Sequence, residues 1–233
     1  MRMTDSSISS KSQIRWGLRA LSAGLLAGWI GVMQAPAAAA ATPEADFVQQ
    51  NIDKGYAILN DTALAAQQRT DKFRDFLSHL MDTKRIASFE LGPYVRTSPD
   101  GDIAKFADGL GDLIASLFQH DLAGNPGETL SVTGSVVRGP DDVIVTTVLT
   151  GSPHANGSPV NMAFRVRKDG TGAPSVVDFQ FEGVSMAMSQ RRDFYSWLQQ
   201  RHGDVAGLAS DLHARARKMR DEDSAAKVAR AGT

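Results

Sequence analysis

The chain has 233 residues, a formal net charge of −1 and no cysteine. The absence of cysteine excludes disulfides, thiol catalysis and cysteine-based metal sites. The slightly acidic balance argues against a protein that holds nucleic acid by neutralising its phosphates, and it is not typical of a polybasic membrane-surface binder.

The first residues, 1–41, have the pattern of a cleaved secretory signal peptide. A basic start is followed by an apolar run over about residues 18–32 and then by the small-residue stretch APAAAAA. This run is short for a membrane span, which needs about 20 residues, and an uncleaved anchor is the alternative. Cleavage between Ala39 and Thr42 removes four of the 25 basic and one of the 26 acidic residues, which leaves 21 against 25 and a net charge of −4.

The rest of the chain predicts one domain over residues 42–217 and a charged, then Ala/Gly-rich tail over 218–233 that is expected to be frayed. The first half of the domain is helical by its apolar periodicity. Helices are predicted from Pro43 through Leu59, over 61–81, in a short piece around 86–91, and from a cap at Ser98 through the stripe that ends at Phe118.

The second half is rich in β-branched residues and turn clusters. Strands are predicted over 130–137, 143–150 and 160–168, with a fourth that ends at Phe181, and helices follow over about 189–201 and 204–217. The fold class is therefore α+β: N-terminal helices, then a curved antiparallel sheet of about four strands, with C-terminal helices packed over it.

The junction between the last strand and the next helix, VVDFQFEGVSMAMSQRRDF, changes the face that carries its apolar residues. They occupy odd positions up to Phe181 and even positions after Gly183, which predicts a β-bulge or a sharp bend at 182–184, before Ser189 caps the helix. The polar residues that alternate with Val177, Phe179 and Phe181 are interpreted as the solvent face of the strand rather than a carboxylate pair. They are Asp178, Gln180 and Glu182. Ser185 lacks the second glycine of a nucleophile elbow.

No arrangement of side chains in the sequence favours catalysis or a metal. The histidines have neither helical pair spacing nor clustered acids, and they are His79, His120, His154, His202 and His213. Gly109 and Gly111 lie inside a helix, where each costs about 1 kcal/mol relative to alanine. They indicate close packing against another element or room for a ligand beside Phe106, Leu110 and Phe118.

Two stretches resemble signatures of the MlaC family of phospholipid-binding proteins, also called the toluene-tolerance family. The first is EGVSMAMSQRRDF with the helix after it, and its matching residues are Glu182, Gly183, Val184, Ser185, Arg191, Phe194 and Leu208. The second is LGPYVRT with a phenylalanine downstream, and its matching residues are Leu91, Gly92, Tyr94, Arg96, Thr97 and Phe106. The variant MSQRRDF looks more like the hopanoid-associated, HpnM-like branch, and Val95 and Ser175-Val176 stand where many members carry tryptophan or a Trp-Lys pair.

The resemblance implies a periplasmic carrier that shuttles phospholipid or hopanoid between the inner and outer membranes, with acyl chains in an apolar cavity enclosed by the sheet and helices. Its implied partners are an inner-membrane ABC-type lipid transport complex and an outer-membrane lipoprotein complex, with no cofactor, metal or catalytic residue. The candidate lipid contacts are Tyr94, Phe106, Leu110, Phe118, Met162, Phe164, Phe181 and Met186, and the candidate head-group residues at the mouth are Arg96 and Arg165. The alternatives are a small enzyme and a non-binding accessory protein on the same fold.

Overall fold

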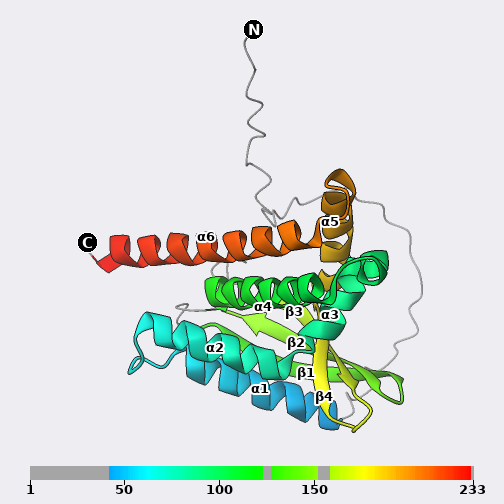
Figure 1. Cartoon of the computed structure of the whole chain (residues 1–233). Coiled ribbons are helices and arrows are strands. Elements are labelled where there is room, and N and C mark those ends of the chain that lie inside the picture. The colour runs from blue at the N-terminus through cyan, green and yellow to red at the C-terminus, as the bar shows by residue number, and fades with distance from the viewer. Residues whose placement is uncertain (1–41, 123–126, 152–157, 232–233) are drawn as a thin grey trace, which may run out of the picture. The chain divides into compact units, whose positions relative to one another are not determined.

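The computed structural model describes residues 42–122, 127–151 and 158–231 (Figure 1). They all belong to one compact unit. The predicted signal peptide falls on residues 1–41 and therefore lies outside the described residues. Within the described residues, no helix is long and apolar enough to cross a membrane.

The helical half contains four α-helices and one short 3₁₀ helix, most of them where the periodicity predicts. They are α1 (Pro43–Leu59), α2 (Ala66–Leu80), α3 (Thr83–Leu91), η1 (Gly92–Arg96) and α4 (Asp100–Leu122). Thr42 caps α1 by accepting a hydrogen bond from the Ala45 amide, and Pro43 occupies the first turn. The second helix starts later than predicted, because the carboxylate of Asp61 accepts a hydrogen bond from the Ala63 amide and holds residues 61–65 as a turn.

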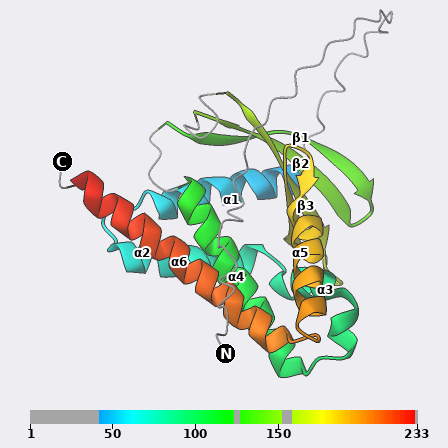
Figure 2. The same ribbon diagram turned by 90° about the horizontal axis from the view of Figure 1, so that it is seen from above.

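The sheet has five antiparallel strands in chain order, β1 (Thr129–Gly139), β2 (Asp142–Thr150), β3 (Val160–Lys168), β4 (Pro174–Phe181) and β5 (Val184–Ser185). The predicted α+β class is therefore confirmed. One face of the sheet is apolar across β2, β3 and β4, where Val145 pairs with Phe164 and Phe164 with Phe179. This face meets the helices, and α1 lies closest to β1 and β2 (Figure 2).

The predicted bend at 182–184 is confirmed, but it is a tight hairpin and not a bulge. Glu182 and Gly183 both have positive φ, 47° and 78°, and Phe181 pairs with Val184 across the turn. Two consecutive residues with positive φ are typical of the type I′ turn that joins antiparallel strands. The apolar residues change parity because the chain reverses direction here, which starts the short strand β5.

The helix after this hairpin, α5 (Met186–Gln200), begins earlier than predicted. Its cap is Ser185, whose hydroxyl accepts a hydrogen bond from the Met188 amide, so the prediction of Ser189 as the cap is wrong. A bulge does occur in β4, the strand before the hairpin. Val177 is its extra residue, because Arg165 of β3 pairs with Asp178 and Val166 pairs with Val176.

The last helix, α6 (Val205–Ala231), includes most of the segment 218–233 that is expected to be frayed. It runs beside α4 and contacts it from Ala209 as far as Asp223 (Figures 1 and 2). Arg220 donates to the Ser116 hydroxyl at 2.9 Å, and His120 lies 2.6 Å from Asp223. These partners lie about a hundred positions earlier in the chain, so the composition of the tail could not indicate them.

Candidate functional site

A small apolar cavity lies where α1 and α2 meet the sheet. Its volume is about 60 Å³. It is lined by Val48, Asn51, Ile52, Gly55, Tyr56, Leu59, Phe73, Phe76, Leu77, Leu80, Met81, Phe118, Leu130, Phe164, Val176 and Phe179. The amide of Asn51 donates to the Phe47 carbonyl at 2.8 Å within its own helix, so this polar group is already satisfied.

The helical wall of this cavity follows from the spacing of apolar residues along α1 and α2. On α2, Phe73, Phe76, Leu77 and Leu80 recur three and four residues apart, which places them on one face. Gly55 of α1 faces this stripe, and a Cβ atom there would make an ordinary contact of 3.5 Å with the Phe76 ring.

The cavity is too small for a large ligand in this conformation. A volume of about 60 Å³ holds only a few water molecules. Pockets for drug-sized organic ligands measure about 300–1,000 Å³. The described residues therefore do not show at this place the enclosed lipid-sized cavity that the resemblance implies.

A larger groove lies on the other side of α2, between α2, α3 and α4. Its volume is about 510 Å³, and Ala104, Ala107 and Gly111 of α4 contribute to its lining. Leu77 and Met81 line both spaces, so their side chains form the wall between the cavity and the groove.

The two glycines of α4 differ in what they face. A Cβ atom on Gly109 would lie 3.0 Å from the Ala209 carbonyl oxygen, so this glycine permits the close packing of α4 on α6. Gly111 lines the groove instead, where the nearest atom to such a Cβ is 3.9 Å away on Thr83. The close-packing interpretation therefore holds for Gly109, whereas Gly111 borders a groove that Phe106, Leu110 and Phe118 do not line.

Of the predicted lipid contacts, the structure places Phe118 and Phe164 in the cavity lining. Met162 and Phe181 pair with each other on the same face of the sheet, beside the lining residues. Phe106 and Leu110 are fully buried, and the Phe106 ring packs edge-on against Phe194 at 5.5 Å. They belong to the packed core and do not line the cavity.

The remaining candidates lie away from the cavity. The Tyr94 ring lies 5.9 Å from Tyr195 of α5, Met186 begins α5, and Arg96 is exposed at the end of η1. Arg165 follows Phe164 and so points to the opposite face of the sheet, where two of its nitrogens bind Asp142 at 2.9 and 2.5 Å. The hydrogen bond from this guanidinium holds the pKa of Asp142 below its usual range.

Sequence reasoning missed most of the α1 and α2 lining residues. Their helical spacing was visible, but spacing identifies a buried face without indicating whether that face borders a cavity. Tyr56 is one example: burial and the charge of Glu128 raise the pKa of its phenol to about 12, so it stays uncharged beside the cavity.

Two buried carboxylates, Asp178 of β4 and Glu90 of α3, lie near each other. Asp178 is not on a solvent face as predicted, because one of its oxygens accepts the Ser185 hydroxyl at 2.6 Å and the other the Ala187 amide at 3.0 Å. Glu90 is 1% exposed, and its two oxygens have no hydrogen-bond partner within the described part of the chain. Burial, with a contribution from the Asp178 charge, raises the pKa of Glu90 well above its usual value.

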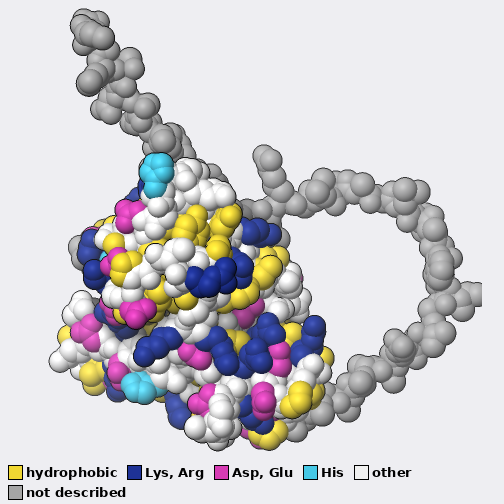
Figure 3. All heavy atoms as spheres, turned by 45° about the vertical axis from the view of Figure 1, so that its right-hand side comes forward, with side chains coloured by type: hydrophobic (Ala, Val, Ile, Leu, Met, Phe, Trp, Pro, Cys, Tyr) yellow, Lys and Arg dark blue, Asp and Glu magenta, His cyan; other side chains and the backbone are white. Residues whose placement is uncertain are grey.

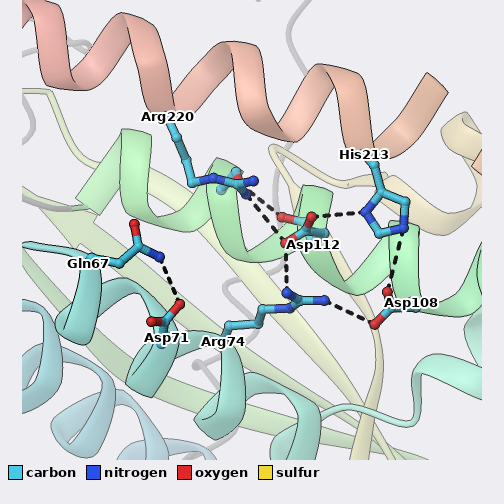
Figure 4. Close-up of polar contacts among 8 residues, drawn as sticks. Gln67, Asp71, Arg74, Asp108, Asp112, His213 and Arg220 are labelled. Carbon is cyan, nitrogen blue, oxygen red and sulfur yellow. Dashed lines mark hydrogen bonds and ion pairs between the residues drawn. The ribbon is translucent and has the colours of Figure 1, made fainter. Parts of the chain in front are cut away.

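A polar network ties α2 to α4 and α6 (Figure 4). Its centre is the buried Asp112 of α4, which lies 3.4 Å from Arg74 of α2, 3.0 Å from His213 and 3.3 Å from Arg220. Arg74 also lies 3.0 Å from Asp108. Among the described residues, no group of three acidic or histidine side chains could hold a metal ion. The network therefore restrains the position of α2, the helix that separates the cavity from the groove.

An apolar cavity between helices and a sheet is the kind of place where α+β domains hold apolar ligands. The family model described as MlaC protein matches residues 49–214. The chain therefore belongs to the MlaC family, as its motifs predict, and it is a lipid-binding protein.

A solved structure with the same fold is the phospholipid-binding protein from Ralstonia solanacearum in complex with a phospholipid. The two are 22% identical with a TM-score of 0.64, over 75% of this chain and 97% of that chain. A comparison with curated proteins found no match.

Proposed function

We propose that this protein is a periplasmic carrier that moves phospholipid between the inner and outer membranes, with the acyl chains held between α1, α2 and the sheet. The observation that carries this proposal is the apolar cavity, whose walls come from α1, α2, Phe118 of α4 and the sheet, and whose lining is almost entirely hydrocarbon. Membership of the MlaC family supports the periplasmic location.

The free energies explain why a carrier is needed. Moving a two-chain lipid into water exposes about 30 CH₂ groups at about 0.8 kcal/mol each, a cost of more than about 20 kcal/mol. An apolar interior removes most of this cost without binding the lipid more tightly than a bilayer does. Equal affinity for the lipid at both membranes drives no net movement, so direction comes from partners, for which an inner-membrane ABC-type complex and an outer-membrane lipoprotein complex are proposed.

Admission of the lipid requires the cavity to widen, and α2 is the element whose movement widens it. Leu77 and Met81 separate the cavity of about 60 Å³ from the groove of about 510 Å³, so an outward shift of α2 joins the two spaces. Arg74 of α2, which lines the groove, bridges Asp108 and Asp112 of α4, and we propose that these ion pairs oppose this shift. The closed conformation is then the empty carrier.

Phospholipid is the proposed ligand, and hopanoid is the second candidate. A phospholipid is bound in the Ralstonia protein of the same fold, which supports the first. The MSQRRDF variant of the family signature favours the second. A rigid polycyclic hopanoid needs a wide cavity, whereas acyl chains can enter a narrow one stepwise.

The experiment is native mass spectrometry of protein purified from the periplasm without detergent, followed by lipid extraction. We expect a stoichiometric adduct with the mass of a phospholipid. An adduct with the mass of a hopanoid would identify hopanoid as the ligand and leave the proposed carrier mechanism unchanged. A clean ligand-free mass, together with no lipid exchange between vesicles, would contradict the proposal and favour a non-binding accessory protein.

A further inference from the structure

One face of the molecule, formed by α3 and α5, gathers most of the exposed large hydrophobic side chains of the described residues. Phe89 of α3, Val184 of β5, and Met188 and Tyr195 of α5 are each 39–51% exposed. The other two such residues, Val136 and Val137, are on β1 and belong to a different part of the surface. None of the four lines the cavity or the groove.

We call the surface that carries these four side chains the α3–α5 face. Arg191 of α5 joins the two helices, since it donates to the Phe89 carbonyl at 3.0 Å and its guanidinium lies 4.8 Å from the Phe89 ring. Met188, Arg192 and Tyr195 follow each other at helical spacing along α5, and the Tyr195 ring meets that of Tyr94. Val184 precedes the first turn of α5.

The two segments that carry the α3–α5 face have more basic than acidic side chains, although the whole chain has a net charge of −1. Residues 84–96 and 182–201 carry six basic side chains and three acidic ones, and one of the three acids, Glu90, is buried. The six bases are Lys84, Arg85, Arg96, Arg191, Arg192 and Arg201. Figure 3, which brings the side of α3 and α5 forward, shows hydrophobic side chains with Lys and Arg side chains beside them.

We propose that the α3–α5 face docks directly on the surface of an anionic lipid bilayer. Aromatic and methionine side chains spaced along two helices insert shallowly at the depth of the head groups, where tyrosine is favoured because one end is apolar and the other polar. Arginines beside them meet lipid phosphates, and each basic residue near an anionic membrane surface favours binding about fivefold. An acidic protein surface is the other partner that this charge fits, and the experiment below distinguishes it.

The α3–α5 face lies beside the groove between α2, α3 and α4, so docking through this face also positions the groove. Lys84 and Ser88 of α3 line the groove between α2, α3 and α4, and Phe89 of the same helix belongs to the face. A molecule docked through α3 and α5 therefore brings one edge of the groove to the bilayer. Docking itself does not depend on the proposed carrier function, because it uses side chains that line neither the cavity nor its wall.

The test is co-sedimentation of the exported protein with vesicles at low salt. We expect binding to vesicles of phosphatidylglycerol and phosphatidylcholine in equal parts, little binding to pure phosphatidylcholine, and loss of binding at high salt. The double variant Arg96→Gln/Arg192→Gln should bind about 30-fold more weakly. Met188→Ser/Tyr195→Ser should also weaken binding, whereas the matched control Val136→Ser/Val137→Ser, which removes the two exposed valines on β1, should bind as the wild type does.

Two results would overturn the proposal. One is the absence of binding to anionic vesicles at low salt, which would favour an acidic protein as the partner of the α3–α5 face. The other is equal weakening by the β1 control and by the α5 variants, which makes the effect nonspecific. A phospholipid adduct in native mass spectrometry is independent of both, so failure of the docking proposal and failure of the carrier proposal are distinguishable.

Discussion

The hydroxyl of Ser185 donates a 2.6 Å hydrogen bond to the buried carboxylate of Asp178. Together they close the hairpin at Glu182-Gly183 and start α5, because Ser185 accepts from the Met188 amide while Asp178 accepts from the Ala187 amide. Asp178 and Ser185 thus act together as the cap of a helix. The family signature EGVS preserves a turn, a cap and the position of α5.

This relationship predicts a loss of stability when Asp178 is replaced. Asp178→Ala removes the acceptor of two hydrogen bonds at a buried site, and hydrogen bonds to a charged group contribute about 1.5–3 kcal/mol each. We expect the free energy of unfolding in urea to fall by about 3 kcal/mol. Phospholipid content per folded molecule should not change, and loss of bound lipid from fully folded Asp178→Ala protein would place this residue in the binding site instead.

The buried carboxyl of Glu90 predicts a dependence of stability on pH. Its pKa is raised above the usual 4.5 in the folded state, so the neutral acid is favoured there and the contribution to stability is fully present only below about pH 4.5. This contribution is lost as pH rises through the raised pKa, and it reaches a constant penalty above it. Asp178 strengthens the effect, because its charge also raises the pKa of Glu90.

Glu90→Gln should therefore flatten the fall in unfolding free energy between pH 5 and pH 8 measured by urea denaturation. The exposed Glu222→Gln serves as the control for a simple change in net charge. Identical pH dependence of the wild type and Glu90→Gln would mean that Glu90 is ionised in the folded protein.

The cavity predicts that a side chain added at Gly55 excludes lipid. A Cβ atom at this position meets the Phe76 ring at an ordinary 3.5 Å, so the rest of a leucine side chain extends into the cavity. Gly55→Leu should lower phospholipid occupancy severalfold, and the gain of about 1 kcal/mol in helix propensity offsets part of the cost of adding a side chain at this buried position.

The matched control for this substitution is Gly101→Leu, at a helical glycine of α4 whose Cβ position has no neighbour within 4 Å. Lipid occupancy, measured by phosphate assay of the purified protein, should be unchanged in this control. Equal occupancy in Gly55→Leu and the wild type would exclude the space beside Gly55 from the lipid site.

The ion pairs of Arg74 predict that this residue controls the rate of lipid exchange. Arg74→Met keeps the length of the side chain but breaks the links to Asp108 and Asp112, while Arg220 and His213 still accompany Asp112. We expect severalfold faster transfer of fluorescent phospholipid between vesicles and a loss of about 1 kcal/mol or less in stability. Lys72→Met, at an exposed lysine of the same helix, should transfer lipid at the wild-type rate, and unchanged transfer in Arg74→Met would refute the restraint on α2.

The sequence predicts the elements of this fold well and their ends less well. β3 spans Val160–Lys168 as predicted, because alternation of apolar and polar residues is a local signal. The hairpin at Glu182-Gly183 was ambiguous, since a bulge and a reversal both change the parity of apolar residues. The burial of Asp178 was hidden for a different reason: its partners come from the helix that the reversal folds back.

The candidate site was less predictable than the fold. Phe118 and Phe164 were identified among the lining residues, but Phe106 and Leu110, which have the same apolar character, turn out to be in the packed core. Periodicity reports which face of an element is buried, whereas a cavity depends on how closely two buried faces meet. The restraint at Asp112 joins side chains from three helices, which no spacing within one helix indicates.

The central claim is that acyl chains lie between α1, α2 and the sheet. Photolabelling with a phospholipid that carries a diazirine at mid-chain, followed by peptide mass spectrometry, tests it most directly. The account predicts labels on α1 and α2 around Ile52 and Phe76, and on β3 and β4 around Phe164 and Phe179, with labelling reduced in Gly55→Leu. Labels confined to other surfaces, or labelling that Gly55→Leu leaves unchanged, would contradict it.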